Sequence, residues 1–332
     1  MEAELAQVRA ALAPLSGGAP IWIVGGTVRA ALRGEPAGGD TDLIISGDAE
    51  EAARTLARAT DADRFPLSTE FGAWRVSGGR LGLTVDITPV QGGDLGADLA
   101  RRDFTVNAVA VPLDGGAPVD LHGGIDDLGA RVLRAVGPDA FRNDPVRLLR
   151  LVRFAQETGF RADPGTRSLA GAEAGLVADA TPERLMEELR RILRLPDAAG
   201  AIVALDELGA LGALVPALDE ARGLEQNPYH HKDVLGHILE VVVHTQEILR
   251  DPEPVFRSQA GEVSAALGQQ LADGLTRGQA LLLGALFHDV AKPATRAVQP
   301  GGRVTFFGHD RLGAEMAEDW CRRWKTSSRL RE

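Results

Sequence analysis

The stretch Gly39-Asp40-Thr41-Asp42-Leu43-Ile44-Ile45 decides how the first part of the chain folds. Two carboxylates alternate with threonine and run directly into an apolar segment, a pattern typical of a strand that enters a core. Because successive side chains of a strand point to opposite faces, Asp40 and Asp42 share one face. Two like charges held this close are unfavourable unless a cation lies between them. Oxygen ligands suit Mg²⁺, so the pair predicts a magnesium site that also takes substrate phosphates.

A glycine turn upstream of the two carboxylates is a candidate phosphate-binding element. Gly25, Gly26 and Arg29 follow the apolar run 21–24. A strand, a glycine turn and the start of a helix can bring backbone N–H groups close to a phosphate, and arginine adds a charge-assisted contact. A plain strand–turn–helix connection is the alternative for the two glycines. A Gly-Gly turn followed by an Asp-x-Asp strand is a layout for nucleotidyl transfer.

The bulk composition is that of a globular chain with room for more than one domain. With 332 residues, 44% of them hydrophobic and 25% charged, the chain is long enough for two or three domains and a sizeable core. Cys321 is the only cysteine, which excludes a disulfide framework and favours a cytoplasmic location. No apolar run reaches the length of a membrane span, and the acidic start at 1–4 is unlike a secretion signal.

The formal net charge of −11 argues against a protein that binds nucleic acid through its overall charge, so such contacts must be local. Arginine-rich clusters predict either phosphate contacts along a folded RNA or solvated helix faces. Their members are Arg142, Arg147, Arg150, Arg153 and Arg161; Arg184, Arg190, Arg191 and Arg194; and Arg322, Arg323, Lys325, Arg329 and Arg331.

Periodicity and turn residues predict an α+β chain in which 1–125 mixes strands with helices and the rest is helical. We expect strands at 21–24, 41–45, 74–76, 83–88 and 108–111, and helices at 2–15, 28–32 and 49–59. From about residue 126 we expect helices alone, at 144–158, 182–195, 198–222, 233–250, 261–275, 278–290 and 310–325. The stretch 223–232 is a predicted linker, and the sequence shows no repeat.

Five short motifs occur in an order that resembles the bacterial class II tRNA nucleotidyltransferases, the CCA-adding and poly(A) polymerase family. They are Gly25-Gly26-x-Val28-Arg29, Asp40-x-Asp42, Arg101-Arg102-Asp103-Phe104-Thr105-x-Asn107-Ala108, Asn143-Asp144-x-x-Arg147 and Glu183-Arg184-x-x-x-Glu188. The resemblance covers residues 20–195. It implies a polymerase-beta-like catalytic head at 1–125, a helical neck and body at 126–222, Mg²⁺ as cofactor, and tRNA, CTP and ATP as partners. Ala30 departs from the family, which usually has an acid there.

The expected chemistry is an in-line displacement at the α-phosphate, which two metal ions assist by activating a 3′-hydroxyl and holding pyrophosphate. Asp40 and Asp42 are the expected metal ligands. Asp86, in the apolar stretch 83–88, is a candidate third catalytic carboxylate, with a strand-end residue as its alternative. The resemblance implies nucleotide contacts by a further set of residues: Gly25, Gly26, Arg29, Arg102, Asp103 and Asn107. For Arg102 and Asp103 an ordinary ion pair is the alternative.

Asp144 and Arg147 lie three residues apart on a predicted helix and therefore share a face. Cytosine and adenine each offer an amino donor beside a ring acceptor, whereas uracil and guanine offer the reverse. A carboxylate beside a guanidinium therefore fits C and A and leaves polar groups unpaired with U and G. The family uses these positions in that way, although Asn143 replaces its usual Glu. An ordinary helical salt bridge is the alternative.

Further helical residues accompany this pair. Arg150 and Arg153 are candidate nucleotide-binding residues on the same predicted helix. We expect Glu183, Arg184 and Glu188 either to orient the neck helix and its Asp144–Arg147 pair or to be purely structural.

The segment between the predicted 83–88 strand and the Arg-Arg-Asp motif bears on which nucleotides are added. Only Pro89–Leu99 intervenes, with glycines at 92, 93 and 96. In the family a shortened segment is associated with enzymes that add only CC, after which a separate A-adding enzyme acts. We therefore expect CC addition, with CCA addition and poly(A) addition as alternatives.

The last third of the chain, 223–332, resembles an HD domain. His237 and the pair His288-Asp289 carry the resemblance, and His309 follows them. Imidazoles with a carboxylate form a suitable site for a divalent ion, and HD domains hydrolyse phosphate esters in many proteins. The usual final Asp has no place before Glu332, so we expect either an incomplete site or a truncated chain. Binding of a second divalent metal and a structural, tRNA-supporting role are the two alternatives for this domain. A phosphohydrolase whose head only binds nucleotide is the rival hypothesis, and His230 and His231 are expected to be linker residues.

Overall fold

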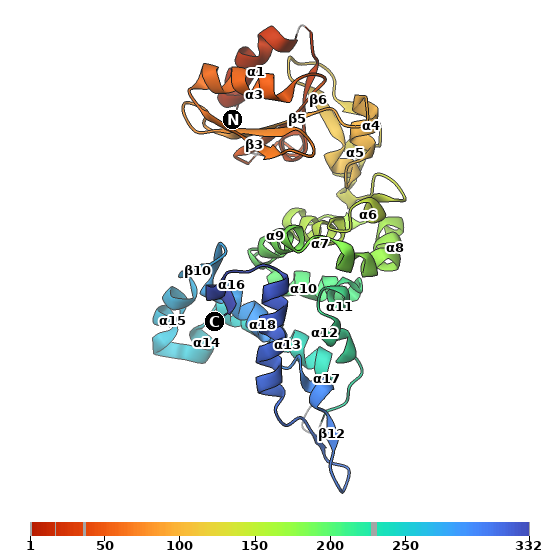
Figure 1. Ribbon diagram of the computed structural model, residues 1–332, viewed down its shortest axis with the longest axis vertical. Coiled ribbons are helices and arrows are strands. Elements are labelled where there is room, and N and C mark those ends of the chain that lie inside the picture. The colour runs from red at the N-terminus through yellow and green to blue at the C-terminus, as the bar shows by residue number, and fades with distance from the viewer. Residues whose placement is uncertain (1, 17, 36–37, 227–230, 332) are drawn as a thin grey trace. The chain divides into compact units, whose positions relative to one another are not determined.

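The computed structural model describes residues 2–16, 18–35, 38–226 and 231–331. The chain divides into two compact units. The first comprises Met1–Ala140 with Phe160–Thr166, and the second Phe141–Gly159 with Arg167–Glu332. Figure 1 shows the helices and strands along the chain.

The first unit is built on a mixed seven-stranded sheet with the strand order β3-β4-β5-β2-β1-β6-β7. Its strands are β1 (Ile21–Val24), β2 (Asp40–Ile45), β3 (Asp63–Ser68), β4 (Ala73–Ser77), β5 (Thr84–Pro89), β6 (Val109–Pro112) and β7 (Val119–Asp120). β2 and β5 are parallel, and the other neighbouring pairs are antiparallel. The five predicted strands are present. β3 escaped prediction because Pro66 interrupts its pattern, which an edge strand tolerates.

One face of this sheet is closed by two helices, α1 (Glu2–Ser16) and α3 (Ala49–Thr60), whose apolar residues pack on the strands. Leu43 and Ile45 of β2 belong to this core. Asp40, Asp42 and Ile44 alternate with them and therefore point to the opposite face. A smaller apolar cluster that includes Ile44 covers part of that face. Asp40 and Asp42, at the start of β2, are not members of this cluster.

Short elements complete the first unit. They are α2 (Gly26–Leu32), α4 (Leu95–Ala100), η1 (Thr105–Asn107), α5 (Gly124–Ala130), β8 (Val132–Leu133) and β9 (Arg161–Ala162). β8 and β9 form a parallel pair, so the expectation of helices alone after residue 126 is wrong for these residues. Strands of two residues are too short to show a periodicity.

The second unit is mainly helical. Its helices are α6 (Ala140–Asn143), α7 (Arg147–Thr158), α8 (Pro164–Glu173), η2 (Ala174–Asp179), α9 (Pro182–Leu193), α10 (Ala198–Glu207), α11 (Ala210–Leu214), α12 (Pro216–Glu220), α13 (Val234–Arg250), α14 (Glu253–Phe256), η3 (Arg257–Gln259), α15 (Ala260–Leu267), α16 (Arg277–Phe287), α17 (Lys292–Thr295), α18 (His309–Arg323) and α19 (Ser328–Arg331). The first residues of α6 and α8 belong to the first unit. Two hairpins interrupt them, β10 (Gln270–Ala272) with β11 (Leu275–Thr276), and β12 (Ala297–Val298) with β13 (Val304–Thr305).

Glycine and proline explain where the helix predictions were too long. The helix predicted at 198–222 is three helices, because Gly209 at φ 78° precedes α11 and Pro216 begins α12. The helix predicted at 261–275 ends at Leu267. Asp273 and Gly274, both at positive φ, then turn the chain through the β10–β11 hairpin. None of the helices in the described part of the chain is long and apolar enough to cross a lipid bilayer.

Candidate active site

Strand register brings three carboxylates to one face of the sheet. Asp42 of β2 lies directly opposite Asp86 of the parallel strand β5, and Asp40 lies opposite Thr84. Since register partners and alternate residues of a strand share a face, Asp40, Asp42 and Asp86 all point away from the core under α1 and α3. The periodicity of 39–45 predicts the shared face of the first two, and the register places Asp86, the candidate third carboxylate, beside Asp42.

Arg75 of β4 is a member of this site that sequence reasoning missed. It is the register partner of Asp86, and its Nε and Nη2 donate to Asp86 Oδ1 and Oδ2, each at 2.7 Å. The hydrogen bond with Asp86 is the largest cause of a raised pKa for Arg75, and the charges of Asp40 and Asp42 raise it further. The alternation Trp74-Arg75-Val76 was a signal that Arg75 faces away from the core, but it could not name the partner.

The start of α2 is fitted closely against β2. Gly25 has φ 71°, and a Cβ added there would lie 2.8 Å from Asp42 Oδ2, so only glycine suits this position. Thr27, which the sequence did not single out, donates from Oγ1 to the carbonyl oxygen of Asp40 at 3.0 Å. The Gly25-Gly26 turn is therefore fixed beside the two aspartates, and Ala30 lies half-buried one turn further on. Nothing in the structure accounts for the missing acid at Ala30.

The residues of the Arg-Arg-Asp motif form a hydrogen-bonded chain that reaches the glycine turn. Asp103 Oδ1 accepts from Asn107 Nδ2 at 2.9 Å and from the backbone N–H of Phe104 at 2.7 Å. Asn107 Oδ1 in turn accepts from Arg29 Nη1. Asp103 is buried, so the structure makes it the anchor that orients Asn107 and, through it, Arg29. A contact of Asp103 with a ribose hydroxyl stays a prediction.

The short segment 89–99 is tied to the same motif. Its last part forms α4, in which Asp98 is buried. Asp98 accepts from the backbone N–H of Gln91 at 2.9 Å and pairs with Arg102 Nη2 at 3.1 Å. The alternative to nucleotide contacts was an ion pair between Arg102 and Asp103. The structure instead pairs Arg102 with Asp98, four residues earlier, at the end of α4.

The proposed base-reading pair lies in the second unit. The predicted helix at 144–158 begins instead at Arg147, so Asp144 precedes it in a turn with Pro145. The pair still meets, with Arg147 Nε 3.8 Å from Asp144 Oδ2. Arg184 of α9 donates to the same oxygen at 2.7 Å. Arg184 thus contacts the carboxylate of the proposed pair, and whether it orients that pair stays a prediction.

Arg150 and Arg153 of α7 both contact Glu188 of α9. Arg153 Nε lies 2.6 Å from Glu188 Oε2, and both side chains are 6% exposed. Arg150 Nη1 lies 3.5 Å from Glu188 Oε1, and Glu157 also pairs with Arg153 at 2.8 Å. This arrangement gives Arg153 a packing role between the two helices, while direct nucleotide contacts of Arg150 and Arg153 stay predictions.

Glu183 behaves differently from Glu188. Its carboxylate accepts from Lys325 Nζ, and both side chains are more than half exposed. Glu183 therefore takes part in a surface ion pair, and such pairs contribute little to stability.

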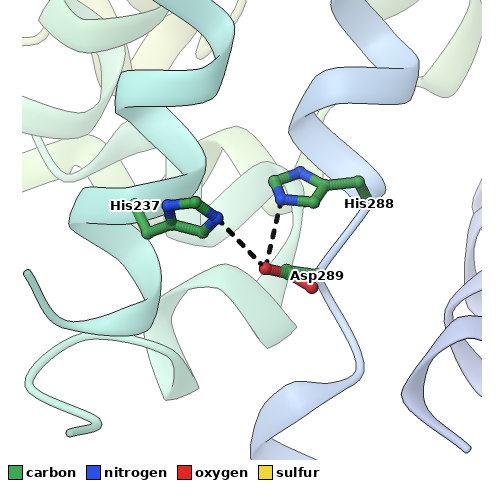
Figure 2. A group of neighbouring side chains, drawn as sticks. All are labelled: His237, His288 and Asp289. Carbon is green, nitrogen blue, oxygen red and sulfur yellow. Dashed lines mark ion pairs between the residues drawn. The ribbon is translucent and has the colours of Figure 1, made fainter. Parts of the chain in front are cut away.

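A second cluster surrounds Asp289 in the HD-like part of the chain (Figure 2). His237 of α13 and His288, which follows α16, direct Nε2 toward Asp289 Oδ2 at 3.5 and 3.1 Å. One ligand atom from each of these three residues lies within 4.8 Å of the others, so the group can hold a metal ion. Two imidazoles and a carboxylate suit a transition-metal ion. The predicted HD residues are thus brought together.

Two further side chains contact this carboxylate. Lys292 Nζ lies 2.7 Å from Asp289 Oδ2, and His309 Nε2 lies 3.3 Å from Oδ1. Burial raises the pKa of Asp289, but hydrogen bonds from His288 and Lys292 outweigh it and hold that pKa well below the usual range. His231 lies in a surface pair with Glu240 at 3.5 Å, as expected of a linker residue, and His230 falls outside the described residues.

Three family profiles match segments of this chain. The profile described as "Poly A polymerase head domain" matches residues 84–134. The profile "Probable RNA and SrmB- binding site of polymerase A" matches 159–222, and "HD domain" matches 234–331.

Similar proteins include two that are named tRNA nucleotidyltransferases. An A-adding tRNA nucleotidyltransferase of Deinococcus radiodurans is 39% identical over 96% of this chain and 67% of its own length. A CC-adding tRNA nucleotidyltransferase of Geobacter sulfurreducens is 35% identical over 85% of this chain, which spans 62% of that relative. A solved structure of a tRNA-processing enzyme shares the fold, with a TM-score of 0.71 at 24% identity, covering 99% of this chain and 75% of that one. The chain therefore belongs to the class II tRNA nucleotidyltransferases of the poly(A) polymerase family, a family of enzymes, and carries a C-terminal HD domain.

Proposed function

We propose that this chain adds nucleotides from CTP or ATP to the 3′ end of tRNA with the help of Mg²⁺. The observation that carries the proposal is the alignment of Asp40, Asp42 and Asp86 on one sheet face, beside the Gly25 turn. Residues 1–125 would carry catalysis, 126–222 nucleotide selection and RNA binding, and 223–332 the HD domain, in the cytoplasm. The names of the relatives support tRNA as the substrate.

The donor set fits the proposed metal. Asp40, Asp42 and Asp86 offer only carboxylate oxygens, the ligands that Mg²⁺ prefers. A bound Mg²⁺ would neutralise charge on the phosphates and favour the attacking 3′-hydroxylate. Because Gly25 has no side chain, the backbone of the turn can lie close to the carboxylate of Asp42. Arg29, which Asn107 orients, would provide a guanidinium for the triphosphate.

The nucleotide base would be read by Asp144 and Arg147. The carboxylate accepts from the amino group of cytosine or adenine, and the guanidinium donates to the adjacent ring nitrogen. Uracil and guanine present a carbonyl to the carboxylate and an N–H to the guanidinium, which leaves both groups without partners. Selection of C and A thus needs no nucleic-acid template.

Replacing Arg184 by glutamine should relax this selection, because Asp144 loses the 2.7 Å contact that fixes its carboxylate. We expect the preference for CTP over UTP, measured as a ratio of kcat/KM, to fall by about tenfold. The matched control is Arg167→Gln, since Arg167 is another exposed arginine in an ion pair, with Glu207 at 3.0 Å. An unchanged CTP/UTP ratio in Arg184→Gln would assign Arg184 a structural role only.

Replacing Gly25 by alanine should lower incorporation by about 10²-fold, since the new Cβ meets Asp42 Oδ2 and even small displacements of reacting groups are costly. Gly34→Ala is the matched control, because Gly34 has φ 67° but nothing within 4 Å of the added Cβ. Gly34→Ala should lose about 1 kcal/mol of stability for its positive φ. Gly25→Ala should lose more, because its ψ of −135° lies outside the left-handed helical region, in a conformation that favours glycine strongly. Equal activity losses in the two would show that strain, not the contact with Asp42, is responsible.

More specifically, we propose CC addition, followed by a separate A-adding enzyme. The support is the short segment 89–99, in which Asp98 is tied to Gln91 and Arg102. The relatives include both A-adding and CC-adding enzymes at similar identity, so similarity alone does not choose between them.

Labelled CTP and ATP offered to tRNA ending before, within and after CC test this specificity. A CC-adding enzyme incorporates CMP into the first two substrates and no AMP into the third. Robust AMP incorporation after CC would contradict the CC proposal and favour A or CCA addition. Equal use of tRNA and unstructured RNA with ATP would favour poly(A) addition.

Hydrolysis of phosphate esters is a second candidate function, because His237, His288 and Asp289 form a possible metal site. Asp289→Asn and Asp42→Asn variants, assayed for both activities, separate the two functions. If Asp289→Asn alone abolishes hydrolysis of a phosphate monoester in the presence of a transition-metal ion, the HD domain is a second active site. If no hydrolysis is found in the unaltered protein, the cluster is structural.

A further inference from the structure

Arg75 lies at the end of a row of charged residues that crosses three strands. It is opposite Asp86 on the neighbouring strand, and Asp86 is opposite Asp42 on the next. Each oxygen of Asp86 accepts one hydrogen bond from Arg75, at 2.7 Å. Bidentate pairs of this kind are the strongest form of carboxylate–guanidinium contact. A metal ion that binds Asp86 must therefore use a carboxylate oxygen that already accepts a hydrogen bond from Arg75.

The guanidinium acts on the whole carboxylate group. The charges of Asp40 and Asp42 both interact favourably with Arg75, in addition to its contact with Asp86. A positive charge among three negative ones reduces their mutual repulsion and, equally, their attraction for a divalent ion.

The Arg75–Asp86 ion pair lies where the guanidinium can leave the carboxylate. The side chains of Arg75 and Asp86 are 34% and 16% exposed, so the guanidinium can move into solvent without disturbing the core. The adjacent residues Trp74 and Val76 pack into the core on the other face and hold the backbone of β4 in place. Movement of Arg75 is thus confined to its own side chain.

We propose that Arg75 is a positioning residue that competes with the divalent metal ion for Asp86, so that metal binding replaces the Arg75–Asp86 ion pair. The inference rests on the proposed metal site of Asp40, Asp42 and Asp86. In the metal-free protein, Arg75 holds both carboxylate oxygens of Asp86 on the side of β4 and compensates part of the negative charge of the site. Its removal should tighten metal binding and destabilise the metal-free state.

Mn²⁺ binding to the whole 332-residue chain without nucleotide tests this inference, with free Mn²⁺ measured by electron paramagnetic resonance. The relevant site is the one lost in Asp42→Asn. Arg75→Gln, and Arg75→Met as a second neutral variant, should bind Mn²⁺ about tenfold more tightly at that site, as expected when a neighbouring positive charge is removed. Arg75→Lys should stay closer to the unaltered protein, since it keeps the charge.

Arg64→Gln is the matched control, because Arg64 stacks over Trp74 on the opposite face and pairs with Glu50. It should leave Mn²⁺ affinity unchanged. A melting temperature that falls in metal-free Arg75→Gln, and recovers with Mn²⁺ more than in the unaltered protein, would agree with competition. Unchanged or weaker Mn²⁺ binding in both neutral variants would overturn the role of Arg75. Absence of an Asp42-dependent site in the unaltered protein would overturn the metal site as well, so the two failures are distinguishable.

Discussion

Replacing Asp42 by asparagine is expected to reduce nucleotide incorporation by at least about 10³-fold, because metal-ion catalysis of this kind contributes several kcal/mol to transition-state stabilisation. Asparagine keeps the shape of the side chain and removes its charge. Asp42 lies opposite Asp86 and close to Gly25, so its loss affects the centre of the carboxylate group. The measurement is single-turnover incorporation of labelled CMP into tRNA at saturating Mg²⁺.

Asp48→Asn provides the matched control for Asp42→Asn. Asp48 is exposed and caps α3 through the backbone N–H groups of Glu50 and Glu51, a role that asparagine also fills. The control should keep nearly full activity and an unchanged melting temperature. If Asp42→Asn folds normally and retains a large part of the incorporation rate, the proposed function is wrong.

Replacing Glu188 by glutamine is expected to destabilise the second unit by about 3 kcal/mol, the low end of the cost of breaking a buried ion pair. Glu188 and Arg153 are both 6% exposed and lie 2.6 Å apart between α7 and α9. The variant leaves the Arg153 guanidinium buried with Glu157 as its remaining acidic partner. For a unit of this size the melting temperature should fall by about 6–12 °C in calorimetry.

Glu187 offers a control on the same helix for the same substitution. Its side chain is 51% exposed and pairs with Arg191 at 3.1 Å. Since surface ion pairs contribute at most about 1 kcal/mol, Glu187→Gln should shift the melting temperature little. Similar shifts for Glu187→Gln and Glu188→Gln would show that burial of the Arg153–Glu188 pair does not matter. Restored stability in a double Arg153→Met and Glu188→Leu variant would instead confirm that the unpaired charge is the cause.

Local pattern in the sequence was sufficient for much of the first unit. The alternation in 39–45 predicts β2 and the shared face of Asp40 and Asp42, and the glycine pair predicts the turn before α2. Helix boundaries were less secure. Pro145 was expected inside the first turn of a helix, but it lies in the turn before α7, which places Asp144 outside the helix.

Sequence reasoning could not find residues whose importance depends on a distant partner. Thr27 is one such residue, since only the packing of α2 on β2 brings it to the carbonyl oxygen of Asp40. Asp98 is another, because it was expected in a plain connecting segment but orders that segment through Gln91 and Arg102.

By itself, the sequence determined that Asp40 and Asp42 share a face, because the direction of a side chain in a strand follows from backbone geometry within a few residues. Only the tertiary structure decided that Asp86 lies next to Asp42 and that Arg75 holds Asp86. Strand order and register arise from pairing between segments far apart in the chain, and they depend on how the apolar face of each strand fits the common core. A carboxylate pair was therefore readable from one stretch and Asp86 was a candidate third member, whereas its place beside Asp42 and its counter-ion required the folded sheet.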